Sequence, residues 1–508
     1  MSTDSAALRR VPAGRVERAR RNSATIRRHL AGVAEREATL VVLAAAYAVT
    51  LLFVAPQMLV QDSWLSLVAG REIVVDGLPH TDGLALWTSG TEWVDQQWLA
   101  HVAFYGLFAL GGIELALLAH VGLLVAAFVS GIVAARRLGG STRSVCLVGL
   151  LCMFAAPWAL QLRAQTFAVP LFVWLLSLLA ADSRAPSRRV FLVFPLLVLW
   201  ANLHGTVVLA ALLVAARGVT YGFAELRAPF RSPRWAGRTA LLTLAPFACL
   251  FASPYGLALA GYYRTMLVSP LLRTFVDEWA VSLPSLATMQ FYVLGIAAAI
   301  LLVRYRSRVT PYEGLALLAL LLLGASAIRS IAWFTLAGLL LLPRLLDGAL
   351  SHWPKRVGRR ARLAVASAAL ASALVTVAVV ATRPEARFTR AWPLAATERV
   401  ADLVASRPGS RVFADARYSD WLLWEQPQLT GRIAYDIRFE LLSRRQFEQI
   451  AAFQARAGAD WRDAIDGYDI VVLDGTSAVP ALRGEGRFDV ELFDEGIAIL
   501  STRTDRAG

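Results

Sequence analysis

Asp62 is the residue of this 508-residue chain whose type and position best suit acid–base chemistry. It follows a long apolar run and is followed by Trp64 and then by Gly70-Arg71. A carboxylate in such a position can accept a proton from an attacking hydroxyl group. Asp is also a preferred N-cap, so the same residue could instead begin a helix over residues 63–75. The two roles are compatible, and the sequence leaves both open.

Two arginines at the ends of apolar runs could bind a phosphate. They are Arg329 in SAIRS and Arg163 in LRAQ. A guanidinium stays charged at any relevant pH, and its forked N–H donors match phosphate oxygens. We therefore expect Arg329, and after it Arg163, to contact a phosphate near lipid headgroups. The alternative is that each arginine only marks a helix end and reaches toward water.

His204 and Glu278 are the other candidate catalytic residues. His204, in WANLHG, could act as an acid or base or donate to a phosphate, or it could be structural. Glu278 precedes Trp279 in a long loop, where a second carboxylate could position a substrate or raise the pKa of Asp62. An aromatic belt alone would explain Trp279. The remaining supporting candidates are polar or aromatic residues of the first loop and of helix ends: Trp64, Asp82, Gln165 and Tyr255.

The composition indicates which class of protein must position these residues. The chain is 57% hydrophobic and 17% charged, which is typical of a polytopic membrane protein. Its formal net charge is +14, but the basic residues form short blocks between apolar runs, which argues against nucleic-acid binding. The three cysteines lie inside apolar runs, and no Cys/His spacing suggests a metal site.

Eleven apolar runs could each form a transmembrane helix. They lie near residues 39–60, 113–135, 144–161, 165–181, 189–203, 205–224, 238–256, 288–304, 311–328, 330–347 and 362–382. Every second connection is rich in arginine, as expected of cytoplasmic loops. Nine arginines in the first 38 residues predict a cytoplasmic tail. We therefore expect a multi-pass protein of the inner (plasma) membrane with its N-terminus inside.

Three regions follow from these patterns. They are a basic cytoplasmic tail (1–38), a transmembrane domain (39–382) with structured outer loops at 61–112 and 257–287, and an extracytoplasmic α/β domain (383–508). In the last region SRVFADAR, GRIAYDIR, YDIVVLD, FDVELFD and IAILST predict strands, and Leu441–Ala457 predicts an amphipathic helix. Asp415, Trp421, Asp436 and Arg438 could line a surface groove of this domain, but a solvated face is the expected place for them. The expected fold is mainly α, with this small α/β domain attached.

The first loop resembles that of bacterial polytopic proteins with a GT-C glycosyltransferase-like fold. It reads D-x-W-x-x-L-x-x-G-R-x-I-x-x-x-G-x-P-x-x-D from Asp62 to Asp82, followed by Trp93-Val94 and Trp98-Leu99. Later R-x-Q, N-x-H-G, S-P-Y-G and E-W motifs and a membrane-edge arginine follow in the same order. The resemblance implies an inverting transfer from a polyprenyl-phosphate sugar to a glycan, lipid or protein acceptor, with Asp62 as base.

Two positions depart from the family pattern. Ser66 stands where many members have His, and Gln97 stands where they tend to have an acid. A different donor or acceptor, or weakened activity, would explain these departures. A transporter or lipid flippase is the rival hypothesis, but the chain lacks the internal repeat that such a protein predicts. A non-catalytic assembly partner on the same fold is the third.

Overall fold

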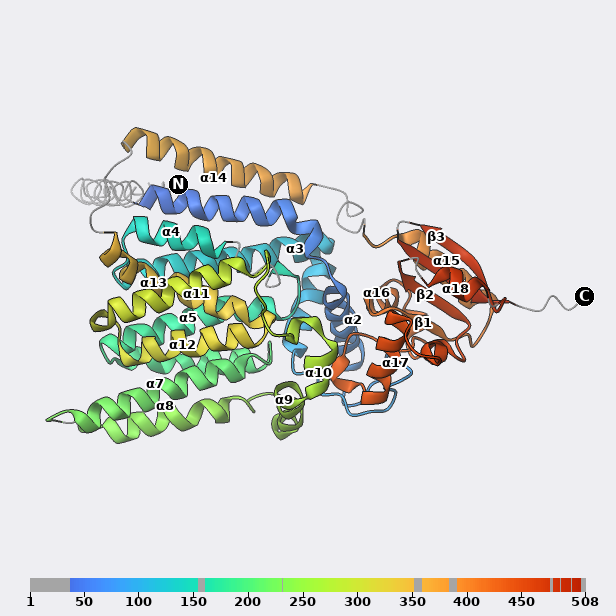
Figure 1. The fold of residues 1–508 in the computed structure, drawn as a ribbon, viewed down its shortest axis with the longest axis horizontal. Helices are drawn as coiled ribbons and strands as arrows, with labels where there is room; N and C mark the ends of the chain where they lie inside the picture. The colour runs from blue at the N-terminus through green and yellow to red at the C-terminus, as the bar shows by residue number, and fades with distance from the viewer. Residues whose placement is uncertain are drawn as a thin grey trace, which may run out of the picture.

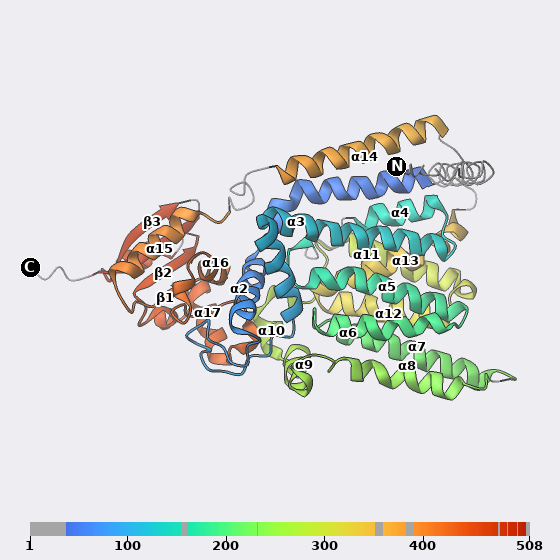
Figure 2. The ribbon, with the colours of Figure 1, turned by 180° about the vertical axis from the view of Figure 1, so that it is seen from behind.

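The protein consists of a helical bundle with a smaller domain at one end (Figure 1). The computed structural model describes residues 37–153, 160–230, 232–350, 359–382, 391–475, 478–484, 486–494 and 496–503. A first helix, Glu37–Met58, begins at the end of the bundle far from the C-terminal domain and runs toward it, as both faces of the molecule show (Figures 1 and 2).

Among the described residues, ten further helices form the bundle, and each predicted apolar run contains a helix. They are α3 (Trp98–Arg137), α4 (Thr142–Cys152), α5 (Gln165–Arg184), α6 (Val193–Ala201), α7 (Val207–Arg227), α8 (Trp235–Cys249), α11 (Met289–Arg304), α12 (Pro311–Ser326), α13 (Ile331–Ala349) and α14 (Arg359–Ala381). Within the described residues, six helices are long and apolar enough to cross a membrane. The others are shorter; α6, for example, follows a 3-10 turn, η3 (Arg188–Leu192). The predicted mainly helical class is confirmed.

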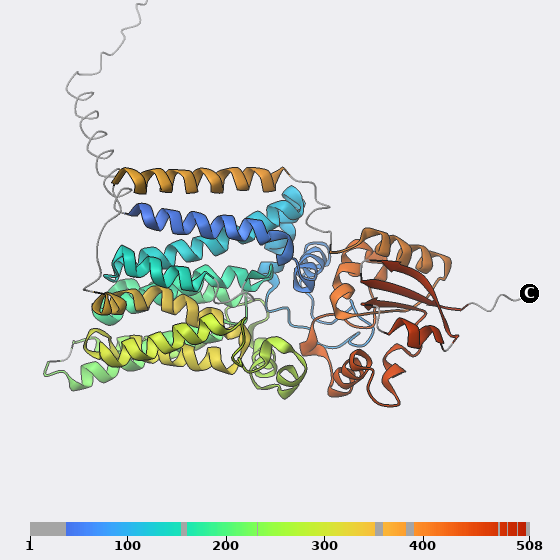
Figure 3. The same cartoon turned by 45° about the horizontal axis from the view of Figure 1, so that its top comes forward.

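The bundle buries its helices unequally. In the helix Ile328–Ala349, 72% of the most apolar stretch is buried inside the protein. In α14 only 17% of the corresponding stretch is buried. The helix Ile328–Ala349 is therefore a central element. By contrast, α14 lies beside the first helix on the outside of the bundle (Figures 1 and 3). Its apolar surface suits contact with lipid rather than with protein.

The first loop (residues 61–112) is folded. It contains α2 (Gln61–Asp76), a hairpin-like segment joined by the bridge Thr81↔Glu92, and the start of α3. The α3 helix bends at Gly112, whose φ of +67° favours glycine. A Cβ on Gly70 would lie 2.3 Å from the His101 carbonyl oxygen, so α2 crosses α3 at very short range.

The second long loop (residues 257–287) and the turn before it contain short helices. They are η4 (Gly256–Ala258), α9 (Leu259–Val268), α10 (Pro270–Phe275) and η5 (Asp277–Trp279). A further turn, η7 (Ile328–Ser330), precedes α13. The loop is attached to the bundle by backbone bonds, from Ser282 N to Ala325 O (3.1 Å) and from Ile328 N to Ala280 O (3.1 Å). These bonds bring η5 next to η7.

The C-terminal domain contains a four-stranded sheet in the order β1-β2-β4-β3. The strands are β1 (Val412–Ala414), β2 (Ile470–Asp474), β3 (Phe488–Asp494) and β4 (Ile497–Thr502), and the helices are α15 (Leu394–Ser406), α16 (Ala416–Glu425), α17 (Arg444–Ala455) and α18 (Val479–Gly484). Only the β1–β2 pair is parallel. The predicted small α/β domain is therefore present.

One predicted strand is wrong. GRIAYDIR forms no regular strand, and its Ile433 makes isolated parallel bridges to Val412 and to Ala85. The reason is that only a few residues of this segment form backbone hydrogen bonds, with β1 on one side and with the first loop on the other. Val412 N bonds to Arg432 O on one side, and Leu86 N bonds to Ile433 O (2.8 Å) on the other. The first outer loop thereby extends the sheet of the C-terminal domain.

The expected solvated face is also wrong, because Asp415, Trp421, Asp436 and Arg438 are all buried. Arg438 donates to Asp82 Oδ1 (2.6 Å) across the contact between the domain and the first loop, and its Nε donates to both oxygens of Asp436 (3.0 and 3.1 Å). The Trp93 ring lies 4.2 Å from its guanidinium carbon. A buried cation shared by two carboxylates therefore joins the domain to the loop.

Candidate active site

Asp62 lies in the first turn of α2 and is not its cap. The cap residue is Val60, whose N–H donates to Ser63 Oγ at 3.1 Å. Ser63 Oγ in turn donates to Leu162 O at 2.6 Å, which links α2 to the segment before α5. The capping role considered for Asp62 is therefore filled by other residues. Its carboxylate has 37% of its side-chain surface accessible, and it points toward a different partner.

That partner is Arg163, which lies just before α5. Its Nη1 donates to Oε1 and Oε2 of Glu278 at 2.7 and 2.8 Å. The same nitrogen lies 3.6 Å from Asp62 Oδ2. Arg163 is buried, so its charge is poorly screened by water. The structure thus brings together three residues that the sequence analysis selected from three separate segments.

Arg329 belongs to the same cluster. Its guanidinium carbon lies 4.5 Å from the centroid of the Trp279 ring, so the two side chains stack. Among the described residues it forms no salt bridge, although the charges of Glu278 and Asp62 lie close enough to influence it. Unlike Arg163, which is bonded to Glu278, Arg329 retains N–H donors for a ligand.

His204 lies in the buried turn between α6 and α7. Its Nδ1 lies 2.8 Å from Thr206 Oγ1 and accepts the Thr206 N–H at 3.2 Å. Nδ1 is therefore unprotonated, and Nε2 carries the proton of the neutral ring. Burial lowers the pKa of His204, and the nearby charges of Arg329 and Arg163 lower it further. At neutral pH His204 is a neutral hydrogen-bond donor beside two cations.

The two carboxylates of the cluster have opposite pKa shifts. Desolvation raises the pKa of Asp62, an effect that Arg163 opposes and the charge of Glu278 adds to. Desolvation would also raise the pKa of Glu278, but Arg163 and Arg329 outweigh it and lower this pKa. Since the Asp62 side chain remains partly accessible, solvent limits the size of its shift. Glu278 is thus a fixed anion, and Asp62 is the more basic of the two carboxylates.

The other predicted residues have structural contacts. Tyr255 donates to Pro79 O at 2.9 Å and so ties the end of α8 to the first loop. Trp64 is buried edge-on against Trp392, 5.5 Å between ring centroids. Asp82 is bonded to Arg438, as described above. These three residues support the loop and the domain, not the Asp62 cluster.

Gln165 lies two residues after Arg163, at the start of α5. Its side chain is buried, and Oε1 has no hydrogen-bond partner within the described residues. An unsatisfied buried amide oxygen costs free energy unless a ligand or water meets it. Gln165 is therefore placed to accept a hydrogen bond beside the cluster.

The sequence analysis missed the buried pair His101 and Asp95. His101 Nδ1 lies 2.8 Å from Asp95 Oδ2. The backbone bond from Leu99 N to Asn202 O (3.2 Å) places the pair next to the WANLHG turn. The sequence signal was present, because Asp95 stands two residues before the Gln97 that departs from the family pattern.

A polar pocket of about 220 Å³ opens near this turn. It is lined by Glu92 and Trp93 of the first loop, Tyr262 of α9 and Glu440 of the C-terminal domain, among others. A Cβ on Gly205 would lie 3.3 Å from the Tyr262 ring, so the pocket adjoins the turn that holds His204. In the described part of the chain, no group of three or more His, Cys, Asp or Glu side chains could hold a metal ion.

Comparison with solved structures identifies the fold. The apo oligosaccharyltransferase of Archaeoglobus fulgidus matches with a TM-score of 0.52 and 13% identity, over 86% of this chain and 69% of that chain. The chain has a GT-C glycosyltransferase fold. ArnT from Cupriavidus metallidurans bound to undecaprenyl phosphate gives a TM-score of 0.49 with 14% identity, over 92% of this chain and 99% of that chain.

The GT-C resemblance inferred from the first loop is thus confirmed at the level of the fold. No protein-family model matches the sequence, and no curated protein matches it either. At 13% identity the likeness to the oligosaccharyltransferase concerns the fold alone. The activity of this chain must be argued from its own residues.

Proposed function

We propose that this protein is a membrane glycosyltransferase that moves a sugar from a polyprenyl-phosphate donor to a cell-envelope acceptor, with inversion. The observation that carries the proposal is the cluster of Asp62, Arg163, Glu278 and Arg329 at one end of the bundle. It combines the basic carboxylate of Asp62 with the guanidinium of Arg329, which has N–H donors available to bind a phosphate. The fold supports the proposal, because the solved structure that matches with a TM-score of 0.52 is an oligosaccharyltransferase.

In the proposed step the acceptor oxygen bonds to the anomeric carbon of the sugar. The bond from that carbon to the phosphate oxygen breaks, and the phosphate keeps the electron pair. The acceptor's proton passes to Asp62, whose raised pKa suits a base. Arg329 meets the phosphate charge with its forked donors. Attack on the side opposite the leaving phosphate inverts the configuration.

Glu278 and His204 have supporting roles in this proposal. Glu278 holds Arg163 in place and keeps Asp62 basic through its negative charge. His204, neutral with its proton on Nε2, donates a hydrogen bond to the donor's phosphate or sugar. We also propose that the cluster and the C-terminal domain face the outside, since the arginine-rich turns lie at the opposite end of the helices.

The lipid-linked sugars of cells that lack this protein provide the test. The donor should accumulate in those cells, and the wild-type protein should clear it. Clearance by wild type but not by Asp62→Asn indicates transfer. Movement of the lipid across the membrane without any transfer of sugar would favour the flippase hypothesis. Clearance that proceeds equally well with Asp62→Asn would favour a non-catalytic partner.

A further inference from the structure

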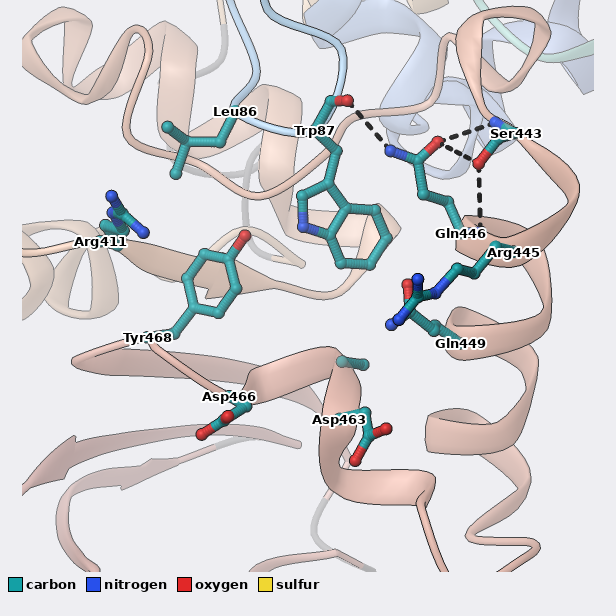
Figure 4. A pocket seen from close by; sticks show the side chains of 11 residues that line it. Leu86, Trp87, Arg411, Ser443, Arg445, Gln446, Gln449, Asp463, Asp466 and Tyr468 are labelled. Atoms are coloured by element: carbon teal, nitrogen blue, oxygen red, sulfur yellow. Dashed lines mark hydrogen bonds between the residues drawn. The ribbon is translucent and has the colours of Figure 1, made fainter.

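A second cavity lies far along the first loop, between that loop and the C-terminal domain (Figure 4). Its volume is about 550 Å³, within the range of small-molecule sites. Leu86 and Trp87 of the first loop form one wall. The other walls come from α17, from the turn η11 (Trp461–Ile465) and from Tyr468 just before β2.

The loop wall of this cavity is held firmly. Trp87 N donates to Ala434 O at 2.9 Å, and Gln446 Nε2 donates to Trp87 O at 3.0 Å. The Trp87 ring stacks on Tyr435, with 5.2 Å between centroids and an interplanar angle of 23°. Ser443 donates to Gln446 Oε1 through both N (2.7 Å) and Oγ (2.8 Å), which orients the amide. The aromatic ring is therefore positioned before any ligand arrives.

The polar groups around Trp87 carry both charges in equal number. The charged residues of the lining are Arg411, Arg445, Asp463 and Asp466, so the lining itself has no excess of cations, and Asp466 also pairs with Arg487 beyond the lining at 3.2 Å. Figure 4 shows Arg445, Gln449 and Asp463 around the space below the Trp87 ring. An anionic ligand would need an excess of cations, and a purely apolar ligand would leave these groups unpaired. A ligand with many hydroxyl groups satisfies both conditions, because each hydroxyl donates and accepts.

We propose that this cavity binds a short, uncharged saccharide. The half-buried Trp87 ring supplies flat apolar surface for the C–H face of a sugar ring, and the buried Tyr468 packs behind it. Asp463 accepts from hydroxyl groups, Arg445 donates to them, and Gln449 does both. Saccharide binding itself is independent of the transfer reaction. The further claim that the bound saccharide is part of the acceptor rests on the proposed function.

The test is calorimetric titration of the full-length protein with neutral oligosaccharides from an array. Asp463→Asn and Arg445→Ala should each weaken binding of the best ligand by about tenfold. Matched controls are Asp460→Asn and Arg444→Ala, whose exposed side chains neighbour the cavity without lining it. Both controls should bind like wild type. The lining variants alter exposed side chains, so their folding is expected to be intact.

The outcomes separate this proposal from the proposed function. If no neutral saccharide binds, or if only anionic glycans or peptides bind, the cavity proposal is overturned. The same holds if the lining and control variants bind equally well. Binding that persists in Asp62→Asn while transfer is lost supports both proposals. Saccharide binding by a wild-type protein that transfers no sugar would uphold the cavity and reject the transferase.

Discussion

Arg163 Nη1 lies 2.7 Å from Oε1 of Glu278, a residue 115 positions later in the chain. The contact joins the connection before α5 to the second outer loop. Asp62 Oδ2 approaches the same nitrogen at 3.6 Å. One buried cation thus lies between two carboxylates and holds them near each other. It is bonded more closely to Glu278, which leaves Asp62 available for proton transfer.

Asp62→Asn should lower the rate of sugar transfer by about 10²–10⁴-fold, since asparagine cannot take the proton. Stability should change little, because Val60 and Ser63 form the cap of α2 and remain intact. The measurement is turnover of purified protein with a lipid-linked donor. Asp76→Asn, at the exposed far end of the same helix, is the control and should be fully active. A normal rate for Asp62→Asn would mean that the base lies elsewhere.

Arg329→Ala should weaken binding of the polyprenyl-phosphate donor by about 10–100-fold, as expected from loss of charge-assisted hydrogen bonds. Arg329 stacks on Trp279 and forms no salt bridge in the described part of the chain, so its removal breaks no internal ion pair. Binding of a labelled donor to the detergent-solubilised protein is the measurement. Arg264→Ala, on the exposed face of α9, serves as control. Unchanged donor affinity in a folded Arg329→Ala protein would reject the role.

Glu278→Gln should shift the acid limb of the pH–rate profile to lower pH. Transfer requires ionised Asp62, so activity is lost as the pH falls through the raised pKa of that residue. The negative charge of Glu278 contributes to this raised pKa. Without the Glu278 carboxylate, the positive charge of Arg163 is no longer neutralised by that residue and acts more strongly on Asp62. Both changes lower the pKa of Asp62. The measurement is the dependence of kcat/KM on pH. An acid limb that moved to higher pH in Glu278→Gln would contradict the prediction.

Arg438→Met should destabilise the contact between the first loop and the C-terminal domain by about 3–5 kcal/mol. The substitution leaves Asp82 and Asp436 buried without their shared cation. Thermal unfolding and limited proteolysis of the full-length protein measure the effect. Arg444→Met removes an exposed pair with Glu448 and should change stability little. Equal stability of the two variants would argue against the buried network as a structural link.

Reporter fusions after Arg308 and after Arg390 should report opposite sides of the membrane. Arg308 ends an arginine-rich connection between α11 and α12, which we expect in the cytoplasm. Arg390 lies near the start of the C-terminal domain (383–508), which we expect outside. Alkaline phosphatase and green fluorescent protein fusions distinguish the two locations. If both fusions were on one side, the proposed orientation of the active site would be wrong.

Local pattern was enough to predict the helices and the end of the bundle at which the candidate residues gather. Apolar runs and arginine-rich turns alternate, so residues at every second turn share one end. For this reason Asp62, Arg163, Glu278 and Arg329 could be selected from the sequence before their contacts were known. The first loop could also be predicted as folded, because its length and pattern exceed those of a simple turn.

Only the tertiary structure decided which charges pair. Asp82 is also a candidate acid of the first loop, yet its partner is Arg438, 356 positions later, and it lies at the domain contact. Glu278 bonds to Arg163, while Arg329 stacks on Trp279. Periodicity reports which face of a local element is apolar. The approach of two side chains within 3 Å depends on how distant elements pack, and no local pattern in the chain specifies that.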